Sequence, residues 1–163
     1  HLLEQLRGGA RLLELGCGTG VPGMCCRVMG GRVTLTEQPQ LVPLLERNVA
    51  SNFPGDDMIV AKELSWSAEA AGKVHEVDGP FDILLACDCV FPPVYGESWI
   101  LLVDAFHELL SRGSGGVALV SWEKRKGDKM EEFLAYCATK APPVKLERVL
   151  WEDPVGIYKV TLG

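Results

Sequence analysis

The sequence has no run of about 18 uninterrupted apolar residues, the length that a membrane-spanning helix needs. Its first residues also lack the long apolar core of a secretory signal peptide. We therefore expect no membrane association and no recognisable secretion signal. The chain opens without a methionine, inside an amphipathic helical pattern, so we also expect that its natural N-terminal segment is missing.

Histidine is scarce, and the cysteines do not form a metal-binding or redox pattern. The three histidines and six cysteines contain no HxH, HxxxH, CxxC or mixed Cys/His cluster, which predicts no metal site. A chain of 163 residues with 47% apolar residues does not need disulfide bonds to fold. We therefore expect reduced cysteines and a cytoplasmic location, with the nucleus as an alternative reducing compartment.

The sequence also lacks the positive charge that nucleic-acid-binding domains usually carry. It has 16 lysine and arginine residues against 22 aspartate and glutamate residues, a net charge of −6. Phosphate backbones are bound mainly by cationic side chains, so we expect no nucleic-acid partner. A cationic macromolecule or a small molecule fits this charge better, although a local basic patch at 124–126 remains open.

The pattern of apolar segments predicts a single α/β domain spanning residues 1–163, because no repeat, low-complexity tract or linker divides the chain. Helical apolar stripes separate most of the short apolar runs, which favours a parallel sheet with helices on both faces. The predicted strands are Arg11–Leu15, Arg32–Thr36, Met58–Val60, Phe81–Ala86, Gly116–Trp122, Leu146–Trp151 and Ile157–Leu162. The predicted core stripes are Leu41, Leu44, Leu45 and Val49; Leu102, Phe106, Leu109 and Leu110; and Met130, Phe133, Leu134 and Cys137.

The last two strands break this alternation. Only five residues, 152–156, separate them, too few for a crossover helix. They should therefore pair as an antiparallel hairpin at one edge of the sheet. The prediction is a Rossmann-like sheet of seven strands, mostly parallel, with one antiparallel strand near the edge.

A glycine-rich loop follows the first predicted strand. Gly16, Gly18 and Gly20 stand ahead of a helix, where glycine allows positive φ angles and close approach of a ligand to backbone N–H groups. Such a loop is weak evidence alone, since a tight strand-to-helix turn has the same pattern. Glu37 raises its weight, because a carboxylate at the end of the second strand can accept hydrogen bonds from ribose hydroxyls.

Glu14 separates two classes of nucleotide ligand. A carboxylate beside the loop would repel a pyrophosphate, but it would attract the cationic amino acid part of S-adenosylmethionine. NAD or FAD is therefore the second choice of cofactor.

Five sequence blocks, taken together, resemble the seven-strand methyltransferases, and specifically the non-SET protein lysine methyltransferases (methyltransferase family 16). The resemblance covers nearly the whole chain, although Asp is more usual where Glu37 stands, and Tyr is as common as Phe at position 91. The blocks are residues 14–23, the acid and helix at 36–49, Leu64-Ser65-Trp66, Cys87-Asp88-Cys89-Val90-Phe91 and Ser121-Trp122-Glu123-Lys124-Arg125.

The resemblance implies a cofactor site for S-adenosylmethionine, with S-adenosylhomocysteine as the product. Trp66 is expected near the adenine, although packing at the surface is a competing interpretation. The residues expected to line the site are Glu14, Gly16, Cys17, Gly18, Gly20, Glu37, Gln38, Trp66 and Cys87.

Asp88 and Phe91 are the predicted catalytic residues. Asp88 follows the fourth strand, where it can hold an incoming ammonium and orient the amine after proton loss. Phe91 can offer its ring face to a cation. Two alternatives stay open: Asp88 caps the helix that begins at Pro92, and Phe91 packs in the core.

We therefore predict a monomeric N-methyltransferase that acts on a lysine side chain of a protein partner. The alternatives are a small-molecule N-methyltransferase and a non-catalytic cofactor-binding scaffold. A nucleic-acid methyltransferase is disfavoured, because residues 88–91 lack the Pro-Pro of the tetrapeptide typical of base N-methylation.

Overall fold

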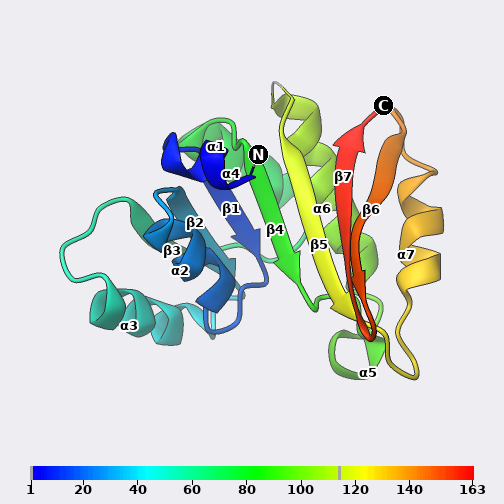
Figure 1. The fold of residues 1–163 in the computed structure, drawn as a ribbon, viewed down its shortest axis with the longest axis horizontal. Helices are drawn as coiled ribbons and strands as arrows, with labels where there is room; N and C mark the ends of the chain where they lie inside the picture. Colours follow the sequence, from blue (N-terminus) through cyan, green and yellow to red (C-terminus); the bar gives the residue numbers. More distant parts are fainter. Residues whose placement is uncertain (1, 114) are drawn as a thin grey trace.

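The computed structural model describes residues 2–113 and 115–163, which form one sheet with helices on both faces (Figure 1). The strands are β1 (Arg11–Leu15), β2 (Arg32–Glu37), β3 (Ile59–Glu63), β4 (Ile83–Cys87), β5 (Val117–Glu123), β6 (Val144–Glu152) and β7 (Val155–Leu162). The helices are α1 (Leu2–Arg7), α2 (Val21–Val28), α3 (Val42–Asn52), α4 (Ala68–Asp78), α5 (Pro92–Tyr95), α6 (Trp99–Arg112) and α7 (Met130–Cys137).

The strand order confirms the predicted Rossmann-like topology. The seven strands lie in the order β3-β2-β1-β4-β5-β7-β6, and β7 runs antiparallel to both of its neighbours. Strands β2 and β3 follow β1 towards one edge of the sheet, whereas the later strands continue from β4 towards the other edge. The strand order therefore reverses between β1 and β4, and open α/β sheets bind ligands at this point, beyond the carboxyl ends of the strands.

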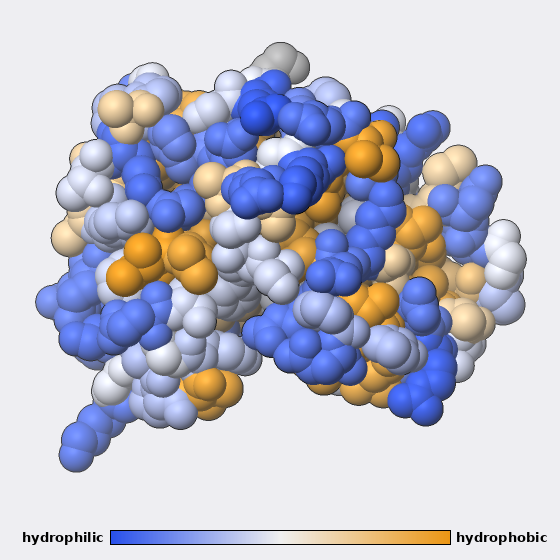
Figure 2. Space-filling model, turned by 180° about the vertical axis from the view of Figure 1, so that it is seen from behind, coloured by the Kyte–Doolittle hydropathy of each residue, from blue (hydrophilic) through white to orange (hydrophobic). Residues whose placement is uncertain are grey.

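The carboxyl ends of β1, β4 and β5 lie at the lower edge of the sheet in Figure 1, close to α5 and the β6–β7 turn. Seen from behind, the surface is indented at this lower edge (Figure 2). The loops that follow β1 and β4 carry most of the predicted site residues. The topology thus brings segments some 70 residues apart in sequence to the same edge.

The core has two layers because successive residues of a strand point to opposite faces of the sheet. Leu13 packs in the cluster that includes Phe106 of α6 and Phe133 of α7. Its neighbour Leu12 packs in the other cluster, with Leu6 of α1 and Leu45 of α3. Helices α4, α6 and α7 therefore cover one face, and α1, α2 and α3 cover the other. The predicted stripes of α6 and α7 face the core, as expected.

Three sequence expectations need correction. The third strand continues past Val60 to Glu63, because backbone pairing with β2 does not require apolar side chains at the sheet edge. The fourth strand begins at Ile83 rather than Phe81. In the predicted stripe of α3, only Leu45 is wholly buried, whereas Leu41 and Leu44 are 40% and 39% exposed, because α3 packs mainly against β3 and β2, at one end of the sheet.

Within the described part of the chain, no helix has both the length and the apolar character to cross a membrane. The six cysteines are free thiols. The residues at 2–113 and 115–163 contain no group of three or more His, Cys, Asp or Glu side chains placed to hold a metal ion.

Candidate functional site

The loop between β1 and α2 has a backbone shape that requires glycine. Gly16, Gly18 and Gly20 have φ angles of 65°, 56° and 85°, in the left-handed region that side chains disfavour. A Cβ atom at Gly20 would also lie 2.8 Å from a methyl carbon of Leu45. The Cys17 N–H donates to the Thr36 carbonyl at 3.1 Å, which ties the loop to the end of β2, and the Cys17 side chain is buried.

Glu37, at the end of β2, holds the middle of this loop. Its Oε2 accepts a hydrogen bond from the Gly18 N–H at 2.9 Å, and its Oε1 accepts one from the Gln38 N–H at 2.8 Å. The carboxylate is 8% exposed. Because each oxygen of a carboxylate can accept about two hydrogen bonds, acceptor capacity remains on both. The Gln38 side chain itself is exposed and bonds to Gln40, at the outer rim of this region.

Glu14 is wholly buried beneath the same loop, on β1. Its Oε2 accepts a hydrogen bond from the Gly23 N–H at 2.9 Å, whereas its Oε1 is buried without a partner in the described structure. Burial raises the pKa of Glu14 to about 7, the Gly23 hydrogen bond opposes this rise, and the nearby charge of Glu37 adds to it. The geometry thus leaves one buried acceptor that a hydrogen-bonding cation would satisfy.

Trp66 covers the start of the glycine loop. A Cβ atom at Gly16 would lie 2.5 Å from Cζ2 of Trp66 and 3.2 Å from Sγ of Cys89. The Trp66 ring lies 6.3 Å from the ring of Tyr95, on α5, with their planes tilted by 54°. Tyr95 was not predicted, because nothing in the sequence shows that the short helix α5 folds back towards Trp66.

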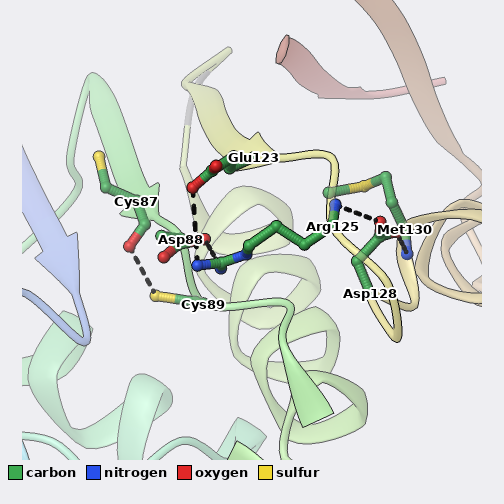
Figure 3. A network of polar contacts seen from close by, with 7 residues as sticks. All are labelled: Cys87, Asp88, Cys89, Glu123, Arg125, Asp128 and Met130. Carbon is green, nitrogen blue, oxygen red and sulfur yellow. Dashed lines mark hydrogen bonds and ion pairs between the residues drawn. The ribbon is translucent and has the colours of Figure 1, made fainter. Parts of the chain in front are cut away.

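Asp88 and Phe91 follow β4, where the structure brings them together with Arg125 from the loop after β5. Figure 3 shows Arg125 reaching towards Asp88. Asp88 has a φ angle of 58°, the single positive φ found outside glycine in the described residues. Its N–H donates to the Ser121 carbonyl at 2.9 Å, which fixes it to the end of β5. Asp88 does not cap α5, since no side chain caps that helix and Phe91 occupies the N-cap position.

Arg125 forms an ion pair with Asp88 through Nη2, and its Nη1 lies 3.7 Å from Oε2 of Glu123. Its guanidinium carbon lies 3.9 Å from the centre of the Phe91 ring, which is half-buried. Arg125 belongs to one of the five sequence blocks, but no role was predicted for it. The available signal was the resemblance of residues 121–125 to a family segment in which an arginine recurs, and the contact with Asp88 was not visible in the sequence.

Cys87 and Cys89 lie on either side of Asp88. Cys87 is half-buried at the end of β4, and its carbonyl accepts a hydrogen bond from the Cys89 thiol, with an Sγ to O distance of 3.5 Å (Figure 3). Burial raises the pKa of both thiols, so both stay protonated near neutral pH. They therefore shape this edge of the site without adding charge.

Two hollows flank these residues. One, with a cavity volume of about 410 Å³, lies at the start of α2 and is lined by Thr19, Val21, Met24 and Asn48 among others. The second, of about 470 Å³, lies beside the Arg125 loop and is lined by Trp122, Lys124, Asp128 and Trp151 among others. None of the predicted cofactor or catalytic residues is among the described residues that line these two hollows.

Known proteins are similar to this chain in sequence or in fold. Over 129 residues, or 72% of the chain, it is 36% identical to "Secreted RxLR effector protein 48" of Plasmopara viticola. Over 153 residues, or 94% of the chain, it is 30% identical to "EEF1A lysine methyltransferase 3" of Xenopus tropicalis. These matches cover 66% and 64% of the two relatives, so the chain spans just under two thirds of their length.

A solved structure, the TehB-like SAM-dependent methyltransferase of Corynebacterium glutamicum, matches the fold with a TM-score of 0.68. That match covers 100% of this chain and 88% of the other at 17% identity, so it supports the fold alone. The profile of a family described as lysine methyltransferase matches residues 3–139. Because this match covers most of the chain, the chain belongs to the lysine methyltransferase family.

Proposed function

We propose that this chain binds S-adenosylmethionine and directs the transfer of its methyl group to a lysine side chain of a protein partner. The observation that carries the proposal is the buried Oε1 of Glu14, which has no partner among the described residues and lies beneath the glycine loop. A site for a pyrophosphate would not place a buried acceptor there, whereas an ammonium group would satisfy it.

The residues present fit this cofactor. Glu14 would receive the ammonium of the methionine part, and the free acceptor capacity of Glu37 would receive the ribose hydroxyls. Trp66 would stack near the adenine, with Cys17, Gln38 and Cys87 around it. When bound, S-adenosylmethionine supplies a methyl group on a positively charged sulfur, and S-adenosylhomocysteine leaves as the product.

The chain's own contribution to the transfer is to bind and orient the acceptor amine. Asp88 and Phe91 offer a carboxylate and an aromatic face, the two features that attract an ammonium group. A displacement at carbon requires an uncharged nitrogen in line with the bond that breaks, so the bound amine must first lose a proton. Asp88 is 52% exposed, so that proton can leave directly to water.

The nature of the partner is also part of the proposal. The net charge of −6 suits a basic protein segment better than a nucleic acid. EEF1A is the first candidate partner to test, because one relative is named as an EEF1A lysine methyltransferase. We further propose that the enzyme acts as a monomer. We also propose a location in the cytoplasm or nucleus, because six free thiols suit a reducing compartment. Size-exclusion chromatography and cell fractionation test these two points.

The decisive experiment uses the full-length protein that contains this chain. It is incubated with methyl-labelled cofactor and a cell extract, and in parallel with EEF1A, and the products are examined by mass spectrometry. Methyl groups on lysine support the proposal, whereas label found only in a small amine or in RNA overturns it. The rate should rise with pH through the neutral range, because free lysine has a pKa of about 10.4.

A further inference from the structure

The Arg125 guanidinium contacts both groups that are proposed to bind the substrate amine, Asp88 and Phe91. It lies on the face of Phe91, 3.9 Å from the ring centre, and it is paired with the Asp88 carboxylate. In Figure 3 its side chain extends from the loop after β5 towards Asp88, with Glu123 beside it. The two groups proposed to recognise the acceptor are therefore already engaged by a cation of the chain itself.

Backbone hydrogen bonds hold both the loop that carries Arg125 and the segment that carries Asp88. The Arg125 N–H donates to Oδ2 of Asp128 at 3.0 Å, and the neighbouring Lys124 N–H donates to the Pro154 carbonyl at 2.7 Å, in the β6–β7 turn. On the other side, the hydrogen bond from the Asp88 N–H to the Ser121 carbonyl fixes the backbone of Asp88. Nε of Arg125 is buried and has no acceptor among the described residues, so water screens the guanidinium only in part.

A carboxylate without a neighbouring cation would oppose the loss of a proton from the substrate amine. An unpaired Asp88 would stabilise the protonated form of a bound lysine, which cannot accept a methyl group. The other acidic groups around this position are Glu123 and Asp128, and Glu37 lies near Tyr95. Tyr95 and the two thiols have raised pKa values, chiefly through burial, so they remain neutral near pH 7. Arg125 is then the cation that balances this acidic surrounding.

We propose that Arg125 is a positioning residue: it keeps Asp88 in a charge-balanced pair beside the acceptor amine, so that the amine is recognised without being held in its protonated form. This inference rests on the proposed function. It predicts that the positive charge of Arg125 favours the neutral state of the substrate amine, which the reaction needs.

The test compares Arg125→Met with Lys126→Met, which removes the same charge from an exposed neighbour that makes no ion pair in the described structure. For each full-length variant, kcat and KM for the protein substrate are measured from pH 6 to pH 9. In Arg125→Met the rise of kcat should move upward by about one pH unit, so kcat near neutral pH falls about tenfold and recovers in alkali. KM should fall or stay unchanged, and Lys126→Met should match the wild type.

A binding measurement without turnover gives a second readout. With S-adenosylhomocysteine present, Arg125→Met should bind a lysine peptide a few-fold more tightly than wild type near pH 7, because Asp88 is no longer neutralised. Arg125→Lys should keep the wild-type pH profile. If methionine disturbs the loop, Arg125→Gln serves as the second neutral variant, and unchanged cofactor affinity shows that the fold is kept.

The outcomes separate the two proposals. A uniform loss of kcat at every pH, with a higher KM and weaker peptide binding, would mean that Arg125 only supports the loop, and it overturns this inference alone. A pH profile of kcat in Arg125→Met that matches the wild type would also overturn this inference alone. If the wild-type protein methylates no protein lysine, the proposed function fails, and this inference fails with it.

Discussion

Replacing Glu14 by glutamine tests the cofactor site most directly. The Glu14 carboxyl is wholly buried with one unpartnered oxygen, and its pKa is raised from 4.5 to about 7. Glutamine keeps the shape and one acceptor for the Gly23 N–H, but it cannot carry a charge. The variant therefore removes the titration of this group while changing the packing little.

The first effect is on stability in the absence of ligand. Between pH 4.5 and about 7, the folded protein retains a proton on Glu14 that the unfolded chain has lost, so the free energy of unfolding falls as pH rises through this window. The shift from 4.5 to about 7 corresponds to about 3 kcal/mol. Urea denaturation at several pH values should show this decline in the wild type, and Glu14→Gln should flatten it.

The second effect is on cofactor binding. If Glu14 receives the ammonium of S-adenosylmethionine, binding must drive off the proton that Glu14 holds. At about pH 6.5, a group with a pKa of about 7 is roughly three quarters protonated, and the ligand's α-amino group, with a pKa of about 7.7–8.0, is already charged. We therefore expect release of about 0.7 protons per ligand bound.

Calorimetry in two buffers with different ionisation enthalpies measures this proton release. Glu14→Gln should bind more weakly and release almost none. A wild-type binding heat that does not depend on the buffer would refute the reasoning, because it would mean that Glu14 either is ionised before binding or does not contact the ammonium.

Three further substitutions separate the roles of the site residues. Glu37→Ala should weaken cofactor binding by about 1.5–3 kcal/mol in calorimetry, because its charge-assisted hydrogen bonds to the Gly18 N–H and to the ribose are lost; an affinity equal to wild type would contradict this. Asp88→Asn should lower kcat about tenfold or more and change cofactor affinity less than a few-fold; loss of both would instead indicate a structural role. Gly16→Ala should strain the loop and displace Trp66, reducing cofactor affinity at least about tenfold, whereas Gly79→Ala shares the positive φ but meets no atom within 4 Å and should only lower the melting temperature.

The architecture could be predicted from the sequence because its determinants are local. The spacing of apolar residues gave the strands and the stripes of α6 and α7, and the short link at 152–156 gave the antiparallel pair. The failures occur where burial depends on distant partners. Leu41 and Leu44 follow a helical stripe, yet their burial is decided by how far the sheet extends beneath α3, which periodicity does not encode.

The candidate site shows the same division. The glycines and the two carboxylates of the cofactor loop are close in sequence, so their pattern was readable. Arg125 lies 37 residues after Asp88, and only the pairing of β4 with β5 brings the two together. Similarly, no pattern indicates that the oxygens of Glu37 accept hydrogen bonds from the backbone N–H groups of Gly18 and Gln38. These roles depend on distances, which a single sequence does not contain.

The backbone of Asp88 has a consequence for how this protein can change over time. A φ angle of 58° is one that stability alone would give to glycine, since a residue with a side chain loses about 1–2 kcal/mol there, and asparagine and aspartate tolerate it best. Under the proposed function, selection for activity would keep an aspartate at a position where backbone strain favours glycine. In a copy of the gene released from that selection, position 88 should be among the first site residues to change, and glycine there would mark a protein that keeps the fold and has abandoned the reaction.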